Sequence, residues 1–169
     1  MAYFTKNDFG RLDYKLLQNS FVTLYYRSQI FSEDLNSLKQ LGYWVKEFDS
    51  SSWRTSEAFY DVFVNDLKFP DYFGRNLDAL NDCLSEIEIP LETGLVIAFS
   101  KFDLFKARFS NFTWDILDII SKRSRQHLLF GKRLICLIQS DDPRISFEEV
   151  GTQPVVWDPR ERPEKNRGL

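Results

Sequence analysis

Apolar runs of strand length alternate with amphipathic stretches of helical spacing along most of the chain. Residues 94–100 (GLVIAFS) and 133–139 (RLICLIQ) are almost continuously apolar, the pattern of strands that are buried on both faces of a sheet. Residues 21–31 (FVTLYYRSQIF) and 43–49 (YWVKEFD) are rich in β-branched and aromatic residues, which also favours strands. The pattern therefore predicts strands at these four places.

The stretches between these strands carry the start and stop signals of helices. Residues 32–42 begin at Ser32, a favourable N-cap, and end at Gly42, a favourable C-cap residue, with an apolar stripe of leucines between them. Asn76 is well placed to cap a later helix. The other predicted helices run from Thr55 or Ser56 to about Lys68, from Leu77 to about Ile87 and from Phe112 to about Gln126.

The alternation of helices and strands across residues 43–140 predicts a layered α/β domain with a small, mainly parallel, three-stranded sheet. Residues 1–42 are expected to add a strand and a helix packed on the same domain. The segment 21–31 either adds an edge strand to the sheet or extends a binding surface. Residues 141–169 are expected to add turns and short edge strands. Their last twelve or so residues are charged and Pro-rich with nothing to bury, so we expect them to be frayed.

Composition agrees with a folded domain, and the charges are unevenly distributed. The chain has 169 residues, of which 43% are hydrophobic and sixteen are Phe, enough for a substantial core. The formal net charge is only -3, but residues 69–92 hold six acidic residues and one basic residue. Residues 101–133 hold eight basic residues and three acidic ones. Separated charges of this kind create a directional field that steers a charged partner.

Several kinds of site and location are not expected. No apolar run reaches the roughly 18 residues of a membrane span, and the N-terminus lacks an export signal, so a cytoplasmic protein is predicted. Cys83 and Cys136 are expected to be reduced, mostly buried thiols. His127, the single histidine, is expected to be partly exposed near a helix end. We predict no catalytic group, metal site or cofactor, because zinc-ligand spacing and Gly-rich phosphate loops are both missing.

The predicted helix 77–87 carries carboxylates along one side. Its core side is apolar, and its opposite side holds Asp78, Asn81, Asp82, Ser85 and Glu86. The three acidic residues repeat every four positions, so each neighbouring pair of like charges destabilises the helix by roughly 0.2–0.5 kcal/mol. This side of the helix is either a solvated surface or a surface held ready for a basic partner.

The segment that starts this helix resembles the signature of a known family. Residues 69–84 read FPDYFGRNLDALNDCL: an apolar residue, Pro, an acidic residue, two aromatics and Gly, then Asn-Leu-Asp-Ala and Asp-Cys-Leu at fixed spacing. This is similar to the pattern of the barstar family, the intracellular inhibitors of secreted bacterial ribonucleases. The order of the flanking elements also agrees, so the resemblance covers about residues 43–140. It implies a barstar-like fold and an inhibitor, not an enzyme.

The resemblance also implies roles for individual side chains. The carboxylate of Asp82 would take the place of the substrate phosphate in the ribonuclease active site, and Asp78 would pair with a basic residue at its rim. Tyr72 would stack over a catalytic side chain, while Gly74 and Asn76 would shape the loop contact. The implied partner is a basic ribonuclease toxin, bound 1:1 by an immunity protein that is otherwise a monomer. The predicted partner-binding set is completed by Asn81, Ser85 and Glu86.

Departures from the family's type member indicate a different target. Asn81 stands in place of an aromatic residue, and Ser85-Glu86-Ile87 replaces a stretch with another exposed aromatic. The region around Lys122 (SKRSRQ) is basic where the family has a further acidic contact. We therefore expect the same mode of binding with a ribonuclease other than the type member's own.

Two other functions remain open from the residues alone. A regulatory or nucleic-acid-associated module would use the basic residues around the end of the last long helix, whereas the inhibitor is not expected to bind nucleic acid directly. An enzyme would use the paired carboxylates of the acidic helix, although residues four apart on an exposed surface make a poor closed site. The basic residues are Lys122, Arg123, Arg125, Lys132 and Arg133.

Overall fold

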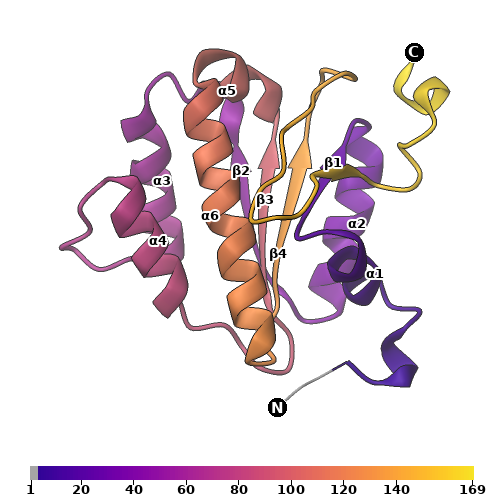
Figure 1. Ribbon diagram of the computed structural model, residues 1–169, viewed down its shortest axis with the longest axis horizontal. Helices are drawn as coiled ribbons and strands as arrows, with labels where there is room; N and C mark the ends of the chain where they lie inside the picture. The colour runs from indigo at the N-terminus through magenta and orange to yellow at the C-terminus, as the bar shows by residue number, and fades with distance from the viewer. Residues whose placement is uncertain (1–3) are drawn as a thin grey trace.

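The computed structural model describes residues 4–169, which form a single parallel sheet covered by helices (Figure 1). The strands lie in the order β2-β3-β4-β1-β5, and every neighbouring pair is parallel. Their bounds are β1 Val22–Tyr25, β2 Trp44–Asp49, β3 Leu95–Ser100, β4 Leu134–Gln139 and β5 Val156–Trp157. The predicted α/β class is confirmed. The three predicted central strands are β2, β3 and β4, and two further strands widen the sheet.

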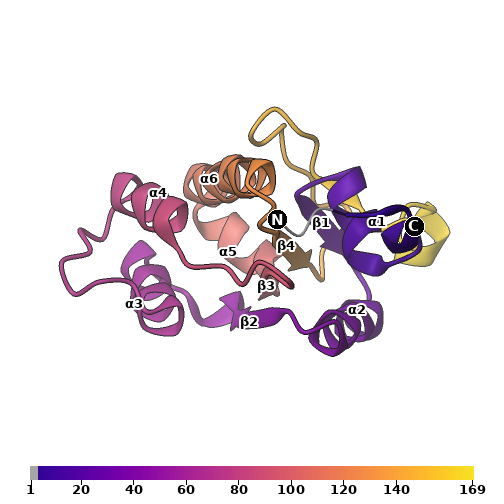
Figure 2. The same ribbon diagram turned by 90° about the horizontal axis from the view of Figure 1, so that it is seen from below.

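Helices cover both faces of this sheet, as Figures 1 and 2 show together. One face carries α1 (Leu12–Asn19) and α2 (Ser28–Gln40). The other face carries α3 (Ser56–Leu67), α4 (Leu77–Glu86), α5 (Phe102–Arg108) and α6 (Ser110–Leu129). Short 3-10 helices lie at Lys6–Asp8, Ser50–Ser52 and Glu164–Arg167. In both views α4 lies at the outer edge of the molecule, beside α6.

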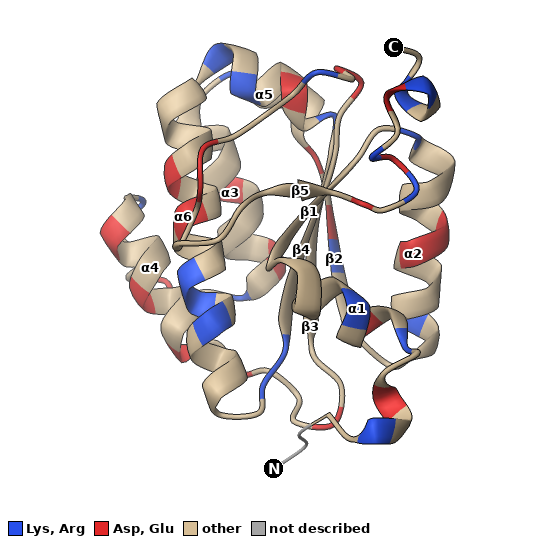
Figure 3. Cartoon of the chain, turned by 45° about the vertical axis from the view of Figure 1, so that its right-hand side comes forward, with Lys and Arg blue, Asp and Glu red and all other residues tan. Residues whose placement is uncertain are grey.

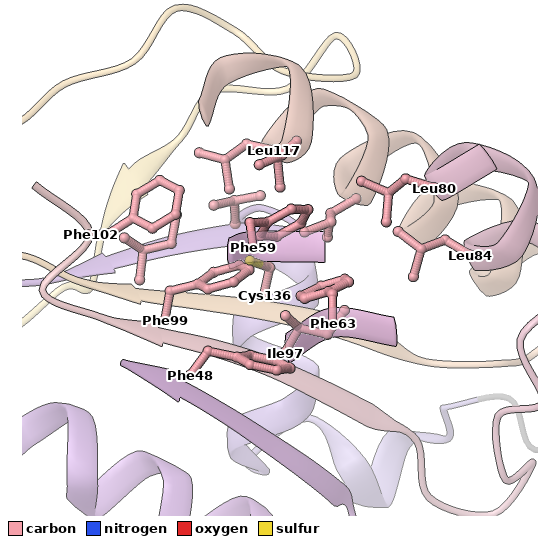
Figure 4. Close-up of a cluster of buried hydrophobic side chains, with 14 of the residues drawn as sticks. Phe48, Phe59, Phe63, Leu80, Leu84, Ile97, Phe99, Phe102, Leu117 and Cys136 are labelled. Carbon is pink, nitrogen blue, oxygen red and sulfur yellow. The ribbon is translucent and has the colours of Figure 1, made fainter. Parts of the chain in front are cut away.

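The central strands are apolar throughout because successive side chains enter two different cores. Ile97 and Phe99 of β3 contribute to the core beneath α3 to α6, whereas Val96 and Ala98 contribute to the core beneath α1 and α2. The first core is rich in phenylalanine, and Figure 4 shows its rings packed on the sheet with leucines of α4 and α6 above them. This core is the platform on which α4 is mounted.

The predicted strand at 21–31 ends earlier than expected. Residues 28–31 form the first turn of α2, and its N-cap is Arg27 in place of the predicted Ser32. Buried apolar side chains of this turn lie on the same side of the helix as the later leucines. Helical spacing therefore overrides the β propensity of these residues. β1 is also an interior strand between β4 and β5, so it is not an edge.

The two ends of the chain are more structured than their patterns suggest. α1 forms where no element was predicted, and α5 has no counterpart among the predicted helices. The tail after residue 157 is not frayed: Glu161 is fully buried, and Arg167 donates hydrogen bonds to the carbonyl oxygens of Pro143, Glu161 and Arg162. These contacts are made by charged groups, so the pattern of apolar residues does not predict that the tail is folded. The division of the chain at residues 43 and 140 stays a prediction.

Candidate partner-binding surface

The N-terminus of α4 is fixed by the side chain of Asn76, as the sequence predicts. Its Oδ1 accepts a hydrogen bond from the backbone N–H of Ala79 at 2.8 Å, which satisfies one of the free donors of the first turn. Its Nδ2 donates to the carbonyl oxygen of Gly74 at 3.1 Å. One amide therefore holds both the helix and the loop that leads into it.

The apolar side of α4 anchors the helix on the core. Leu80 and Leu84 have no exposed surface, and they pack against the long helix α6 (Figure 4). Full burial of such a side chain contributes roughly 1.5–3 kcal/mol to stability. Leu77 and Cys83 are half-buried at the border of this side. The predicted core side of the helix is therefore confirmed.

The C-terminal end of α4 is held by His127, which corrects the expectation of a partly exposed ring. The side chain of His127 is buried, with a relative exposure of 4%. Its Nε2 lies 2.7 Å from the carbonyl oxygen of Leu84, one of the carbonyls left free at the end of the helix. Because a carbonyl only accepts, Nε2 carries the proton. Burial lowers the pKa of His127, although the bond to Leu84 opposes this, and the nearby charges of Lys132 and Arg123 lower it further.

The outward side of α4 presents the carboxylates of Asp78, Asp82 and Glu86, which we call the acidic face. All three residues are exposed, and Figure 3 shows them as bands of acidic residues along α4. Within residues 4–169 none of these carboxylates makes a hydrogen bond or an ion pair. The structure therefore leaves these three charges available, and nothing in the fold accounts for their repulsion.

Two residues of the predicted partner-binding set are turned toward the protein itself. Asn81 is half-buried, and its Oδ1 accepts a hydrogen bond from Nε of Arg123 on α6 at 2.8 Å. Ser85 is also half-buried, and its hydroxyl donates to the backbone carbonyl of Asp82 at 2.7 Å. The sequence places both residues on the outward side of α4, and the structure places them at its border.

The loop before α4 presents an exposed tyrosine and is tied to α3. Tyr72 is 84% exposed, with no hydrogen bond or ring contact in the described part of the chain. Arg75 has a left-handed backbone conformation, with φ of 48°. Its guanidinium forms ion pairs with Glu57, at 3.0 Å, and with Asp61. Sequence reasoning missed Arg75, because its partners lie 14 and 18 residues away and no local pattern marks them.

The basic residues that suggested nucleic-acid binding do not all share one surface, although Lys122 and Arg123 line the same groove between α4 and α6. Lys122 pairs with Asp118 at 2.6 Å, and Arg125 donates to Thr152 at 3.3 Å. Arg133 is buried beneath the opposite face of the sheet, near Asp13 and stacked on the ring of Phe4. This dispersal does not favour the nucleic-acid interpretation.

Other kinds of site find little support in residues 4–169. No group of three or more His, Cys, Asp or Glu side chains is arranged to hold a metal ion there. Neither cysteine forms a disulfide, and burial raises the pKa of both the Cys83 and the Cys136 thiol. No helix in this range is long and apolar enough to cross a membrane. A cavity of about 690 Å³ lies between α5, α6 and the segment 146–148, and none of the partner-binding set lines it.

Comparisons with known proteins identify one family and one similar protein. A family model described as "Barstar (barnase inhibitor)" matches residues 43–139, which is more than half of the chain. A protein of Bacillus subtilis (strain 168) named "Putative ribonuclease inhibitor YrdF" is 30% identical over 79 residues, which are 46% of this chain and 82% of that protein. The family match runs from β2 to β4 and includes the whole of α4.

Proposed function

The chain belongs to the barstar family, and we propose that it inhibits a ribonuclease by laying the acidic face of α4 over the enzyme's active site. The observation that carries this proposal is the state of Asp78, Asp82 and Glu86. They are exposed, unpaired within residues 4–169 and mutually repulsive. A ribonuclease active site is cationic because it binds RNA phosphates, so it is the complementary surface.

The spacing of the three carboxylates supports a phosphate-mimic mechanism. Residues four apart lie one above the other on a helix, roughly 5–6 Å apart at their Cβ atoms. A row of negative charges at regular spacing resembles an RNA backbone, with Asp82 at its centre. In this arrangement Asp82 enters the site of the substrate phosphate, and Asp78 and Glu86 meet basic residues on either side of it.

The support beneath α4 favours tight binding. Asn76 fixes the start of the helix, Leu80 and Leu84 fix its middle, and His127 fixes its end. A surface that is rigid before binding loses little conformational entropy when the complex forms. Tyr72, in the loop before the helix, is exposed and available to stack on the partner.

The biological setting that fits this mechanism is protection of a cell against a ribonuclease toxin. The protein would act in the cytoplasm as a non-enzymatic immunity protein, bound 1:1 to its toxin. The border residues Asn81 and Ser85 make internal bonds here, which supports a cognate enzyme different from the type member's ribonuclease.

The proposal is tested by adding the purified protein to a panel of basic bacterial ribonucleases and following RNA degradation. We expect one enzyme to lose its activity at a 1:1 ratio and to co-elute with the protein on gel filtration. The same titration against an acidic ribonuclease serves as the control. The proposal fails if no ribonuclease is inhibited, or if the protein is captured by RNA alone.

A further inference from the structure

A small groove between α4 and α6 adjoins the acidic face, and two cationic residues and one acidic residue line it. Its volume is about 350 Å³, and it lies where the basic lower half of α6 approaches α4 (Figure 3). Its lining combines apolar and charged side chains, namely Leu77, Asp78, Asn81, Ile119, Lys122 and Arg123. A partner that covers the acidic face also covers this groove.

The two cations of the groove differ in how their charge is balanced. Lys122 forms an ion pair with Asp118 at 2.6 Å. Arg123 makes no ion pair within residues 4–169. Its Nε donates to the amide oxygen of Asn81 at 2.8 Å, and its Nη1 donates to the amide oxygen of Gln126. Both acceptors are neutral, so the guanidinium is held in a fixed orientation without a carboxylate bound to it.

A docked partner would remove water from the Arg123 guanidinium, which lowers the affinity unless a new charge compensates it. Removing an ion from water costs several kcal/mol unless an opposite charge takes the place of the solvent. A guanidinium is best matched by a carboxylate, which accepts two parallel hydrogen bonds from it. Asn81 accepts from the N–H of Nε and Gln126 from one N–H of Nη1, so the second N–H of Nη1 and both of Nη2 are left for such an acceptor.

We infer that the partner ribonuclease carries an Asp or Glu carboxylate beside its basic cleft, and that this carboxylate binds Arg123 in the groove between α4 and α6. The inference rests on the proposed function. It makes Arg123 a specificity-determining residue, because an enzyme without this carboxylate leaves Arg123 buried and unpaired. The docking surface is therefore bipolar, with a row of acidic groups and a basic edge.

The bipolar surface predicts that removal of Arg123 weakens binding to a basic enzyme, whereas simple charge attraction predicts that it strengthens binding. If only net charge mattered, removal of any arginine near the acidic face would strengthen binding to a basic enzyme. Arg125 lies two residues from Arg123 on α6, and its only described bond is to Thr152. It therefore provides a matched control for loss of one positive charge.

The test compares Arg123→Gln and Arg125→Gln by surface plasmon resonance against the ribonuclease that the wild type inhibits. We expect Arg125→Gln to dissociate at the wild-type rate and Arg123→Gln to dissociate at least tenfold faster. Asn81→Ala, which keeps the charge but releases its orientation, is expected to give a smaller increase. Thermal unfolding of each variant verifies that α4 and α6 remain folded.

The outcomes separate this inference from the proposed function. If the wild type binds the ribonuclease and Arg123→Gln dissociates at the wild-type rate or more slowly, the inference is wrong and the proposed function stands. If Arg123→Glu loses binding and an Asp or Glu→Arg substitution on the enzyme restores it, the pairing is established. If the wild type inhibits no ribonuclease, both are wrong.

Discussion

The acidic face of α4 and a second acidic region of the molecule use the same residue types in opposite ways. The second region, which we call the C-terminal clamp, consists of Tyr25, Asp34, Asp158 and Arg160. Arg160 bonds Asp34 at 2.5 Å and Asp158 at 2.8 Å, and the hydroxyl of Tyr25 donates to Asp34 at 2.7 Å. Both clamp carboxylates are buried and paired, whereas the acidic face is exposed and unpaired.

The difference separates charges that serve the fold from charges that the fold leaves exposed for the proposed partner. In the clamp, burial raises the pKa of Asp34, and the hydrogen bonds from Tyr25 and Arg160 oppose that rise. The Asp34 carboxylate can be buried because its hydrogen bonds with Tyr25 and Arg160 replace those with water. The same bonds tie the C-terminal segment to β1 and α2. On α4 no such compensation exists within residues 4–169. Only Asp78, in the first turn of α4, gains from the helix dipole, and in the described part of the chain neither Asp82 nor Glu86 forms an ion pair that stabilises the fold.

The largest expected effect on stability comes from breaking the clamp. Arg160→Ala leaves Asp34 and Asp158 buried beside each other without their cation. A fully buried pair would cost roughly 3–5 kcal/mol, and because the Arg160 side chain is 42% exposed we expect a loss of about 2 kcal/mol. Urea denaturation measures it. Arg162→Ala, an exposed neighbour, is the control with a change below about 0.5 kcal/mol.

An equal loss in both variants would mean that the clamp is not a structural device. Inhibition of the ribonuclease by folded Arg160→Ala is expected to be unchanged, because the clamp lies outside the family match and away from α4.

A second effect depends on pH and tests the support beneath the acidic face. The folded chain has a lowered pKa at His127, so below the ordinary value of 6.5 the unfolded chain binds more protons than the folded one. The unfolding free energy therefore falls as the pH drops from 6.5 toward 5, by at most about 1.4 kcal/mol per pH unit. His127→Gln is expected to flatten this slope in urea titrations. Identical slopes in the two proteins would contradict the assignment.

The smallest effect is a gain in stability on the acidic face itself. Glu86→Gln removes one like-charge pair with Asp82 and a negative charge from the C-terminal turn of α4. We expect the unfolding free energy to rise by roughly 0.2–0.5 kcal/mol at low salt, and by less at high salt. Chemical denaturation at two ionic strengths tests this. A clear loss of stability would show that Glu86 serves the fold.

The features that the sequence could predict are those in which the interacting residues lie close together along the chain. The cap at Asn76, the apolar side of α4 and the acidic face depend on residues within one helix, so periodicity and capping rules find them. The contact from His127 to Leu84 spans 43 residues, and the bond from Arg160 to Asp34 spans 126. Polar contacts over such distances leave no periodic signal, and the tail was therefore expected to be frayed.

Contacts between distant residues also explain why the strand predicted at 21–31 is too long. The aromatic and β-branched residues at 21–31 favour a strand locally, but Ile30 and Phe31 complete the apolar side of α2.

The predicted position of Asn81 on the outward side of α4 depended on its helical angle alone. Only the position of Arg123 on the neighbouring helix draws it inward.

The most direct test of the central claim is the inhibition constant of Asp82→Ala against the ribonuclease that the wild type inhibits. Asp66→Ala on α3, an exposed carboxylate outside the acidic face, is the matched control. We expect Asp82→Ala to lose about 2 kcal/mol or more of binding, roughly 30-fold, a range for which the barnase–barstar complex is itself a reference case. Its unfolding free energy is expected to rise slightly, because Asp82→Ala removes the like-charge pairs with both Asp78 and Glu86. The inhibition by Asp66→Ala is expected to stay unchanged. Equal inhibition by Asp82→Ala and the wild type would contradict the claim that the acidic face is the binding surface.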